Sequence, residues 1–555
     1  MSAILGLEAD FSNLTFTRLG HAAGKAAGTD FDQYSMYGGR RRCNLTDSGI
    51  VTAYYGDPAF TETGKLQHAV TASGVILPAG TCVQVMVEQP KFYYRVVPLV
   101  TATISESTGS HLRKAQYWIS DEPIEGYRLH PAFVKDGGEL DYIYLSAYEG
   151  CRYYTNIDAY CGDIGGVSFG TDKLSSVAGY RPLSGQYDSL TRANARTLAH
   201  NRGSGWELST IASVSCSQLL MTVEYGVFHL QEAIGKGVVN FSVDESNQAV
   251  SSGGTASLGN HSGMAEGING QASVSYRGEE NFWGNIWTWV DGVNIWGDGT
   301  MGGGYSYICT DGNFLDDTKS GNYENAGFTN ASGYGYISAF GYSEKYDWLF
   351  LPSETTNNYN LSIGDYTYSS ASRSGYTAAQ LGGRWNSTVL AGPYFWNIDT
   401  AASTYGLYAG ARLTYFPKVR WIYNRTQQDV ANRTSKGHYN AADLNRVGST
   451  MSYIASRLNQ CGYKVSIYPK TDWSLSDIPT QTQMKHYLDD LETLRSAITV
   501  YNTTPATAPD MLGLTWQEAN DIEQILKDID RLITDMTAEW HYSDELFCGE
   551  VINDD

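Results

Sequence analysis

The sequence predicts an α+β protein that has loop-rich β structure in its larger part and helices at its C-terminal end. Residues 1–417 hold short runs of β-branched and aromatic residues between stretches rich in Gly, Ser and Asn, which is typical of strands joined by loops. Residues 418–555 instead carry apolar residues at alternating spacings of three and four, the pattern of amphipathic helices. We therefore expect a small β-rich module at 1–87, an α+β domain at 88–417 and a helical region at 418–555.

The strand pattern becomes strong after residue 83. VQVMVEQPKFYYRVVPLV (83–100) combines β-branched and aromatic residues in quick succession, and HLRKAQYWIS (111–120) and ELDYIYLSAYEG (139–150) follow as further strands. From 250 to 417 the chain is rich in Gly, Ser, Asn and Tyr, which predicts short strands between long loops. The domain at 88–417 should therefore be mainly β structure.

Two helices are predicted between these strand-rich parts. TRANARTLAHN (191–201) is short and ends shortly before Gly203. ELSTIASVSCSQLLMTVEY (207–225) is longer and well supplied with apolar residues, and Gly226 follows it directly. Glycine commonly occupies the first position after a helix, because it accepts the left-handed backbone found there.

Three further helices are predicted in the C-terminal region. Their apolar positions are Leu444, Val447, Met451, Ile454 and Leu458 in the first, Met484, Tyr487, Leu491, Leu494 and Ile498 in the second, and Ile522, Ile525, Ile529, Leu532 and Met536 in the third. Thr515 and Glu518 have the spacing of a capping box for the last helix. Such narrow stripes fit a three-helix bundle within the chain and coiled-coil association between subunits equally well.

Charge and targeting signals exclude several classes of partner. The net charge of −21 argues against nucleic acid, which needs a basic patch. No stretch approaches the roughly 20 apolar residues that span a membrane, and MSAILGLEADFSNL at the N-terminus lacks the pattern of a signal peptide. We therefore expect a protein made in a cytoplasm, with no membrane insertion.

The cysteines are dispersed without CxxC spacing, so we expect them to be reduced, structural thiols. They are Cys43, Cys82, Cys151, Cys161, Cys216, Cys309, Cys461 and Cys548.

The usual signatures of catalysis and of cofactor binding do not occur in the sequence. It contains no HExxH, GxSxG, Walker A or GxGxxG motif, so no cofactor is expected. Two oxygen-rich segments, DGVNIWGDG and DGNFLDD, fit either Ca²⁺ coordination or ordinary turns through Asp291, Asn294, Asp298, Asp311, Asp316 and Asp317. Paired carboxylates for glycoside hydrolysis need not be close in sequence, so a glycan-degrading enzyme stays an alternative.

One segment has the composition of a recognition surface. Between Thr355 and Ala411 the chain is dominated by Tyr, Ser, Thr, Gly, Asn and Ala. Tyrosine offers a large amphipathic contact with few rotatable bonds, and Ser, Gly and Asn offer adaptable hydrogen bonds, which is why antibody-like paratopes share this composition. The alternative interpretation is that the composition marks long loops between strands.

Three motifs carry a resemblance to a known family. GNIWTWVDGVNIW (284–296), WLFLPSE (348–354) and LGGRWNSTVLAGPYFWNIDTAASTYGLYAGARL (381–413) resemble the C-type-lectin-like domain of phage-encoded variable proteins, the targets of diversity-generating retroelements. That domain is related in fold to formylglycine-generating enzymes. Upstream segments such as GRRRCNL and TRANARTLAHNRGSGW also resemble structural proteins of tailed phages of gut Firmicutes.

The resemblance implies a receptor-binding surface at about 355–413 whose residues vary. In this family, adenine-directed mutagenesis acts commonly at AAY codons. Randomising the first two bases of AAY never yields Trp, Met, Lys, Gln or Glu. Between Thr355 and Ala411, the residues outside the permitted set are Gln380, Trp385 and Trp396. A fixed frame combined with a variable face would produce this pattern.

The resemblance assigns two roles to the residues around 381–413. The expected frame consists of tight-turn glycines, buried tryptophans with bonded indole N–H groups and one arginine: Gly382, Gly383, Trp385, Trp396, Trp287, Trp289 and Arg412. The expected ligand-binding residues are Arg384, Asn386, Ser387, Val389, Leu390, Pro393, Tyr394, Asp399, Thr400, Ser403, Thr404, Tyr405 and Tyr408. An upstream extension of this face is expected at Tyr359, Asp365, Tyr366, Tyr368 and Arg373.

We therefore predict a non-enzymatic phage virion adhesin that is assembled in the bacterial cytoplasm and sits on the tail or head surface. Its expected partners are a bacterial surface receptor, protein or glycan, and other virion proteins, and the resemblance implies a homo-oligomer, commonly a trimer. The activity of the formylglycine-generating relatives is not transferred, because Cys309 is the single cysteine in the relevant half. A tail-associated glycan-degrading enzyme and a purely structural head or tail decoration protein are the alternatives.

Overall fold

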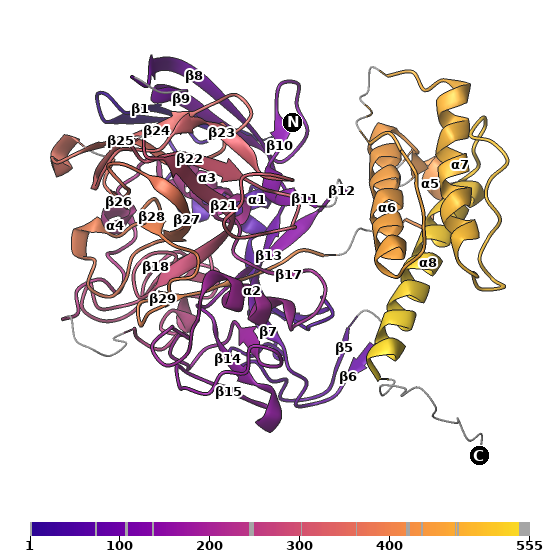
Figure 1. Cartoon of the computed structure of the whole chain (residues 1–555), viewed down its shortest axis with the longest axis horizontal. Helices are drawn as coiled ribbons and strands as arrows, with labels where there is room; N and C mark the ends of the chain where they lie inside the picture. Colours follow the sequence, from indigo (N-terminus) through magenta and orange to yellow (C-terminus); the bar gives the residue numbers. More distant parts are fainter. Residues whose placement is uncertain are drawn as a thin grey trace. The chain divides into compact units, whose positions relative to one another are not determined.

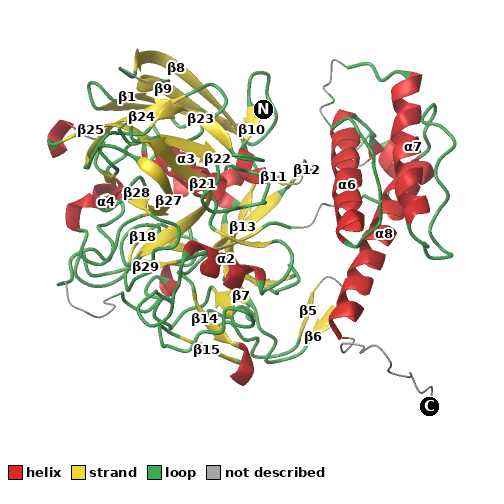
Figure 2. Cartoon of the chain, viewed as in Figure 1, coloured by secondary structure: helices red, strands yellow, loops and turns green. Residues whose placement is uncertain are grey.

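The computed structural model divides into two compact units, which are described separately. It describes residues 3–72, 75–105, 109–135, 138–242, 249–300, 302–361, 363–417, 422–433, 437–471, 473 and 477–542. Unit 1 comprises Met1–Val134 and Leu140–Pro417, and unit 2 comprises Lys135–Glu139 and Lys418–Asp555 (Figure 1). Unit 1 is α+β and mostly sheet, whereas the elements of unit 2 are mainly helices (Figure 2).

Residues 1–87 do not form the separate module that was expected. β1 (Ile4–Asp10) pairs antiparallel with β9 (Ser110–Ser120), and β3 (Arg41–Leu45) pairs antiparallel with β7 (Gln84–Pro90). The early strands thus satisfy their backbone hydrogen bonds with β9, which lies beyond the expected boundary, and with β7, which runs across it. The first 87 residues are therefore an integral part of unit 1.

A 14-stranded sheet runs through unit 1. Its main hydrogen-bonded path is β10-β8-β9-β24-β26-β28-β27-β21-β22-β23, and β1, β2, β25 and β29 pair off this path. The bounds not yet given are β2 (Thr15–Gly20), β8 (Tyr93–Thr103), β10 (Arg128–Leu129), β21 (Trp287–Asp298), β22 (Tyr305–Ile308), β23 (Glu324–Thr329), β24 (Gly335–Tyr342), β25 (Pro352–Thr356), β26 (Tyr366–Tyr368), β27 (Ser374–Leu381), β28 (Trp396–Thr400) and β29 (Ala409–Gly410). All three motifs of the sequence contribute strands to this sheet.

Smaller sheets complete the β structure. A 6-stranded sheet has the order β17-β30-β13-β7-β3-β4, and three-stranded sheets have the orders β15-β14-β16 and β18-β19-β20. β5 pairs with β6, and β11 with β12. The bounds are β4 (Val51–Tyr54), β5 (Val70–Ala72), β6 (Val75–Leu77), β11 (Val134–Lys135), β12 (Gly138–Glu139), β13 (Tyr142–Ser146), β14 (Cys151–Tyr154), β15 (Ala159–Cys161), β16 (Lys173–Ser175), β17 (Trp206–Leu208), β18 (Gly263–Met264), β19 (Val274–Tyr276), β20 (Glu279–Glu280) and β30 (Leu413–Tyr415). The predicted strand region 83–100 is in fact two strands, β7 and β8, which belong to different sheets.

Both helices predicted in the first part of the chain are confirmed. α2 (Arg192–His200) is capped by Thr191, and α3 (Ile211–Tyr225) ends at Gly226, whose φ of 65° is left-handed. α3 begins later than expected, because Trp206–Leu208 pairs with β30 as β17. Every α3 residue except Tyr225 is buried, so this helix forms part of the core. The short helices are α1 (Ser35–Gly38), α4 (Leu230–Ala233) and the 3-10 turns Thr29–Phe31, Pro131–Phe133, Thr155–Ile157, Ala256–Leu258, Tyr359–Leu361 and Thr388–Leu390.

Unit 2 contains the three predicted helices. They are α6 (Ala441–Gln460), α7 (Gln481–Ala497) and α8 (Trp516–Tyr542), preceded by the short α5 (Gln427–Ala431). Their apolar stripes pack against one another in a single cluster that includes Leu444, Val447, Met451, Ile454, Leu458, Tyr487, Leu491, Leu494, Ile522, Ile525 and Ile529. The capping box is formed as predicted, since the Thr515 backbone N–H donates to Glu518 (2.8 Å) and the Glu518 N–H donates to the Thr515 hydroxyl (3.2 Å). The stripes thus build a bundle within the chain, as the first of the two interpretations expected.

Within the part of the chain that the structure describes, no helix combines the length and the apolar character needed to cross a membrane.

Candidate ligand-binding face

Three of the frame tryptophans are fully buried. The Trp396 indole N–H donates to the Phe350 carbonyl oxygen at 2.8 Å, and the Trp289 indole donates to the Leu190 carbonyl oxygen at 3.3 Å. Trp385 is equally buried, but among the described residues its indole N–H finds no acceptor, contrary to expectation. The indoles therefore hold the segment in place mainly by packing, and two of them also by a hydrogen bond.

The double glycine at the start of the motif is required by the backbone. Gly382 and Gly383 have φ values of 94° and 89°. Residues that carry a Cβ atom rarely adopt this positive-φ region. A Cβ atom on Gly383 would lie 2.9 Å from the Phe395 ring, and one on Gly382 would lie 2.9 Å from the Phe282 carbonyl oxygen. The glycines thus let β27 turn sharply against the segment that leads into β28.

Arg412 closes the other end of the motif. Its guanidinium is buried and donates to the carbonyl oxygens of Glu280 (2.8 Å) and Ser146 (2.9 Å). Because these acceptors belong to β20 and β13, the arginine ties the end of the motif to two other sheets. The remaining frame tryptophan, Trp287, packs with its ring centroid 4.5 Å from that of Phe395.

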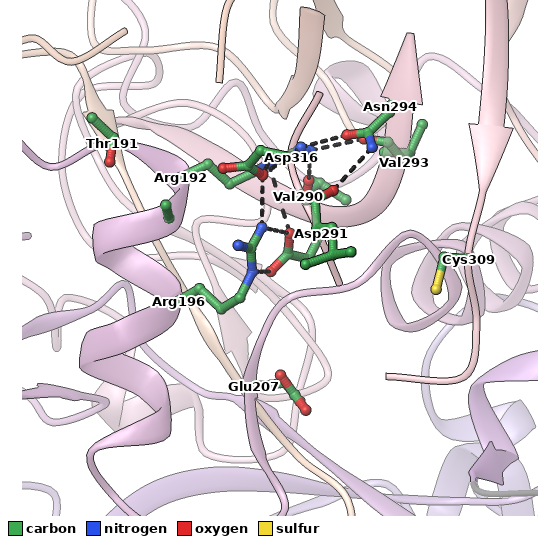
Figure 3. Close-up of polar contacts among 12 residues, drawn as sticks. Thr191, Arg192, Arg196, Glu207, Val290, Asp291, Val293, Asn294, Cys309 and Asp316 are labelled. Carbon is green, nitrogen blue, oxygen red and sulfur yellow. Dashed lines mark hydrogen bonds and ion pairs between the residues drawn. The ribbon is translucent and has the colours of Figure 1, made fainter. Parts of the chain in front are cut away.

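The acidic segments that could suit Ca²⁺ contact arginines instead. Arg196 donates to both carboxylate oxygens of Asp291 (2.6 and 2.7 Å) and to Asp316 (2.8 Å), and Arg192 donates to Asp316 and to the Val293 carbonyl oxygen (2.7 and 2.8 Å) (Figure 3). Burial acts to raise the pKa of Asp316, but the two guanidinium groups hold it below its usual value. This cluster is an internal ion-pair network that fixes α2 to β21.

The other acidic residues form turns. Asp298 accepts from the Thr300 backbone N–H at 2.9 Å, and Asp311 accepts from the Asn313 N–H at 3.0 Å. Asp317 has a φ of 51°, a backbone that Asp tolerates in turns. Within the described ranges, no group of three or more His, Cys, Asp or Glu side chains could hold a metal ion. Turn chemistry therefore accounts for these residues.

A row of five tyrosines lies in edge-to-face contact across β24, β26 and the turn at 359–361. In order along the row they are Tyr359, Tyr336, Tyr366, Tyr368 and Tyr334, with successive ring centroids 5.3, 5.0, 5.5 and 5.0 Å apart and interplanar angles of 75°, 90°, 69° and 66°. Tyr334 is 54% exposed and the other four are half-buried. We call this set the tyrosine row.

Phe395 packs against the tyrosine row, and a hydrogen bond holds the row at its Tyr334 end. The Phe395 ring lies 5.3 Å from that of Tyr368, and Leu390 packs into the same cluster. The Tyr334 hydroxyl donates to Asp399 at 2.9 Å, and Asp399 is also paired with Arg373. Burial, and then the Asp399 carboxylate, raise the pKa of the Tyr334 hydroxyl. The row is thus a fixed surface rather than a set of independent side chains.

Further candidates extend the surface beyond the row. The Arg384 guanidinium lies over the Tyr408 ring at 4.5 Å, and the Arg384 backbone N–H donates to the Ser387 hydroxyl at 2.9 Å. Val389, Tyr405 and Tyr408 are 47%, 54% and 37% exposed. Of the other expected binding residues, Ser403 is exposed and the half-buried ones are Arg384, Asn386, Leu390, Asp399, Thr400 and Thr404.

Tyr394 was expected on the surface and is instead part of the core. Its hydroxyl bonds to that of Thr222 on α3 (2.5 Å), and its backbone N–H donates to Asp365 (2.7 Å). The Gln218 side chain donates to the Pro393 carbonyl oxygen at 2.6 Å, so this segment packs directly on α3. Burial raises the pKa values of Tyr394 and Asp365 well above their usual range. Four further candidates are buried with Tyr394 and are corrected in the same way: Ser387, Pro393, Asp365 and Arg373.

Two members of the tyrosine row were missed by sequence reasoning. Tyr334 and Tyr336 lie in SGYGYIS, upstream of the segment that was singled out by composition. This stretch shows the same mixture of Tyr, Gly and Ser, so the signal was present but short. Its proximity to Tyr366 and Tyr368 depends on the pairing of β24 with β26, which the sequence does not reveal.

The chain is similar to a solved structure, but it matches no protein-family model. No curated protein matches it either. Among solved structures, the chain is similar to one described as "Major Tropism Determinant U1 Variant", with 14% identity over 73% of this chain and 93% of that chain and a TM-score of 0.25.

Proposed function

We propose that the chain is a phage virion adhesin whose unit 1 contains a C-type-lectin-like domain that attaches the particle to a bacterial surface receptor. The tyrosine row, Arg384, Tyr405 and Tyr408 form the ligand-binding face. The observation that carries the proposal is the tyrosine row. Its rings are held by contacts with one another and with Phe395, and its ring edges and hydroxyl groups are available to a ligand. Such residues give contact area at a small cost in side-chain entropy, as in paratopes.

Burial of the non-permitted residues supports a variable face. Gln380, Trp385 and Trp396 are the residues between 355 and 411 that AAY diversification cannot produce, and they are 2%, 1% and 0% exposed. Exposed positions such as Val389, Tyr405 and Tyr408 all belong to the permitted set. Selection for a constant core beneath a varied surface would give this distribution.

The adhesin acts without catalysis and as a homo-oligomer. The family resemblance implies that this oligomer is a trimer. Several weak sites on one particle then gain apparent affinity through high effective concentration. The helical unit or the N-terminal strands provide the contact with other virion proteins after assembly in the bacterial cytoplasm.

The proposal is tested by the binding of labelled, purified protein to intact cells from a panel of Firmicutes strains. Tyr334→Ala and Tyr408→Ala should each lower the apparent affinity about tenfold or more, the scale expected when one large apolar contact is lost. Tyr468→Ala is the matched control, because Tyr468 is 87% exposed in unit 2. Unchanged binding by both face variants would favour a decoration protein, and release of sugars from purified wall glycan would favour the enzyme.

A further inference from the structure

We infer that the ligand-binding face continues onto two loops outside the variable segment, 162–167 and 184–188, where Ile164 and Tyr187 form a constant apolar contact for a protein receptor. We call these the side loops. This inference rests on the proposed function and adds to it a second part of the footprint and the chemical class of the partner.

The side loops touch the variable segment at a glycine. The Gly185 backbone N–H donates to the Gly406 carbonyl oxygen at 2.9 Å. A Cβ atom on Gly185 would lie 2.9 Å from the Tyr405 Cβ atom, so a larger residue would push the two segments apart. Tyr405 therefore lies directly against one side loop.

A second glycine joins the side loops to each other. A Cβ atom on Gly165 would lie 3.3 Å from the Tyr187 Cβ atom, which places Tyr187 beside the residue that follows Ile164. The loop that carries Ile164 thus lies beside the loop that carries Tyr187, and this second loop lies against Tyr405. Segments that are far apart in the sequence therefore meet at this part of unit 1.

Hydrogen bonds hold the side loops in this arrangement. Asp163 accepts from the Ser184 backbone N–H (3.0 Å) and from its hydroxyl (2.5 Å). Arg152, which is buried and paired with Asp172, donates to the Gly166 carbonyl oxygen at 2.6 Å. Asp188 accepts from the Val167 backbone N–H at 3.2 Å. The loops therefore present their apolar side chains from a preorganised backbone, which lowers the entropy cost of binding.

The exposed side chains indicate the chemistry of the partner. Ile164, Tyr187 and Tyr405 are 53%, 59% and 54% exposed. Isoleucine has no polar atom, so it offers a partner apolar contact and no hydrogen bond. The side chains of a protein supply such surface, whereas a glycan exposes mostly hydroxyl groups. A protein receptor with an apolar patch is therefore the partner that fits.

The position of the side loops makes this contact constant. Residues 162–188 lie outside 355–413, the segment proposed to vary. Variants that differ at Tyr405 or Tyr408 would keep Ile164 and Tyr187 unchanged. The side loops would then orient every variant against the same type of receptor surface.

The test measures the binding of the full-length protein to intact cells of a Firmicutes strain that it recognises. Ile164→Ser and Tyr187→Ala should each weaken binding about tenfold, with unchanged thermal unfolding, since both side chains are more than half exposed. Ile268→Ser is the matched control for the isoleucine, because Ile268 is 69% exposed. Treating the cells with protease beforehand should abolish binding.

The outcomes separate this inference from the proposed function. If Tyr405→Ala and Tyr408→Ala weaken binding but both side-loop variants bind like the wild type, the side loops are not part of the footprint and the adhesin proposal stands. Binding that survives protease but is lost after periodate oxidation of the cells would replace the protein receptor by a glycan. If none of the four variants changes binding, the adhesin proposal fails as well.

Discussion

The buried aromatic residues of 381–413 and the tyrosine row belong to the same residue class, but their settings are opposite. Trp396 and Tyr394 are fully buried, and their N–H and O–H groups bond within the chain. Tyr334 and Tyr336 contact other rings and remain partly open to solvent. The difference teaches that the same residue class performs two separable tasks here: the buried aromatics determine the fold, and the exposed ones are available to a ligand.

The largest effect is expected from breaking the frame. Trp396→Ala should lower the free energy of unfolding by about 3–5 kcal/mol, because it removes a fully buried indole and leaves a cavity in the core of unit 1 beside Phe350. Chemical denaturation of the variant and the wild type measures this change. A loss below 1 kcal/mol would mean that the segment holds its place without the indole.

A second large effect is expected from pH, through the buried carboxyl group of Glu149. Glu149 accepts from the side chain of Asn285, in the motif GNIWTWVDGVNIW, at 2.6 Å, and burial raises the pKa of Glu149 to about 8. Because the pKa is raised in the folded state, stability is greatest below the unfolded value near 4.5 and falls as the pH rises towards 8. The decline should be on the order of a few kcal/mol. Glu149→Gln should flatten the profile of unfolding free energy between pH 5 and 8, and an unaltered slope would assign it to other groups.

A smaller effect on stability is expected from the hydroxyl of Tyr394. Tyr394→Phe removes the hydrogen bond to Thr222 and keeps the ring, so the unfolding free energy should fall by about 1 kcal/mol. Cell binding should stay unchanged, since the residue is buried. If Tyr394→Phe weakened cell binding and left the unfolding free energy unchanged, Tyr394 would belong to the ligand-binding face.

The smallest effect on stability is expected on the tyrosine row itself. Tyr334→Phe removes the hydrogen bond to Asp399 at a half-exposed position, and the unfolding free energy should change by less than about 0.5 kcal/mol. Binding should weaken measurably if this hydroxyl contacts the receptor. Comparing thermal unfolding with cell binding for Tyr334→Phe and Tyr394→Phe tests the separation of the two tasks directly.

The sequence predicted those features that depend on local pattern. The stripes at Leu444–Leu458 and Ile522–Ile529 gave their helices directly, because three- and four-residue spacing places apolar residues on one helical face. Gly226 likewise marked the end of α3. Trp385 and Trp396 are buried and Val389 is exposed, as expected, whereas Ser387, Pro393 and Tyr394 are buried contrary to expectation.

Features that depend on distant partners could not be predicted. Tyr394 resembles an exposed loop residue until α3, more than 160 residues earlier, is seen to pack against it. Asp291 resembles a cation ligand until Arg196 on α2 is found beside it. The tyrosine row likewise requires the pairing of β24 with β26. In each case the decisive neighbour belongs to another element, and no local spacing encodes it.

The segment between β27 and β29 is anchored at both ends, by the double glycine on one side and by Arg412 on the other. Substitutions at its exposed positions, such as Val389 and Tyr405, therefore exchange side chains on a backbone that is held at both ends. Under the proposed function, changes at these positions would alter what is recognised at little cost to the fold. The same property makes the segment a natural starting point for a display library.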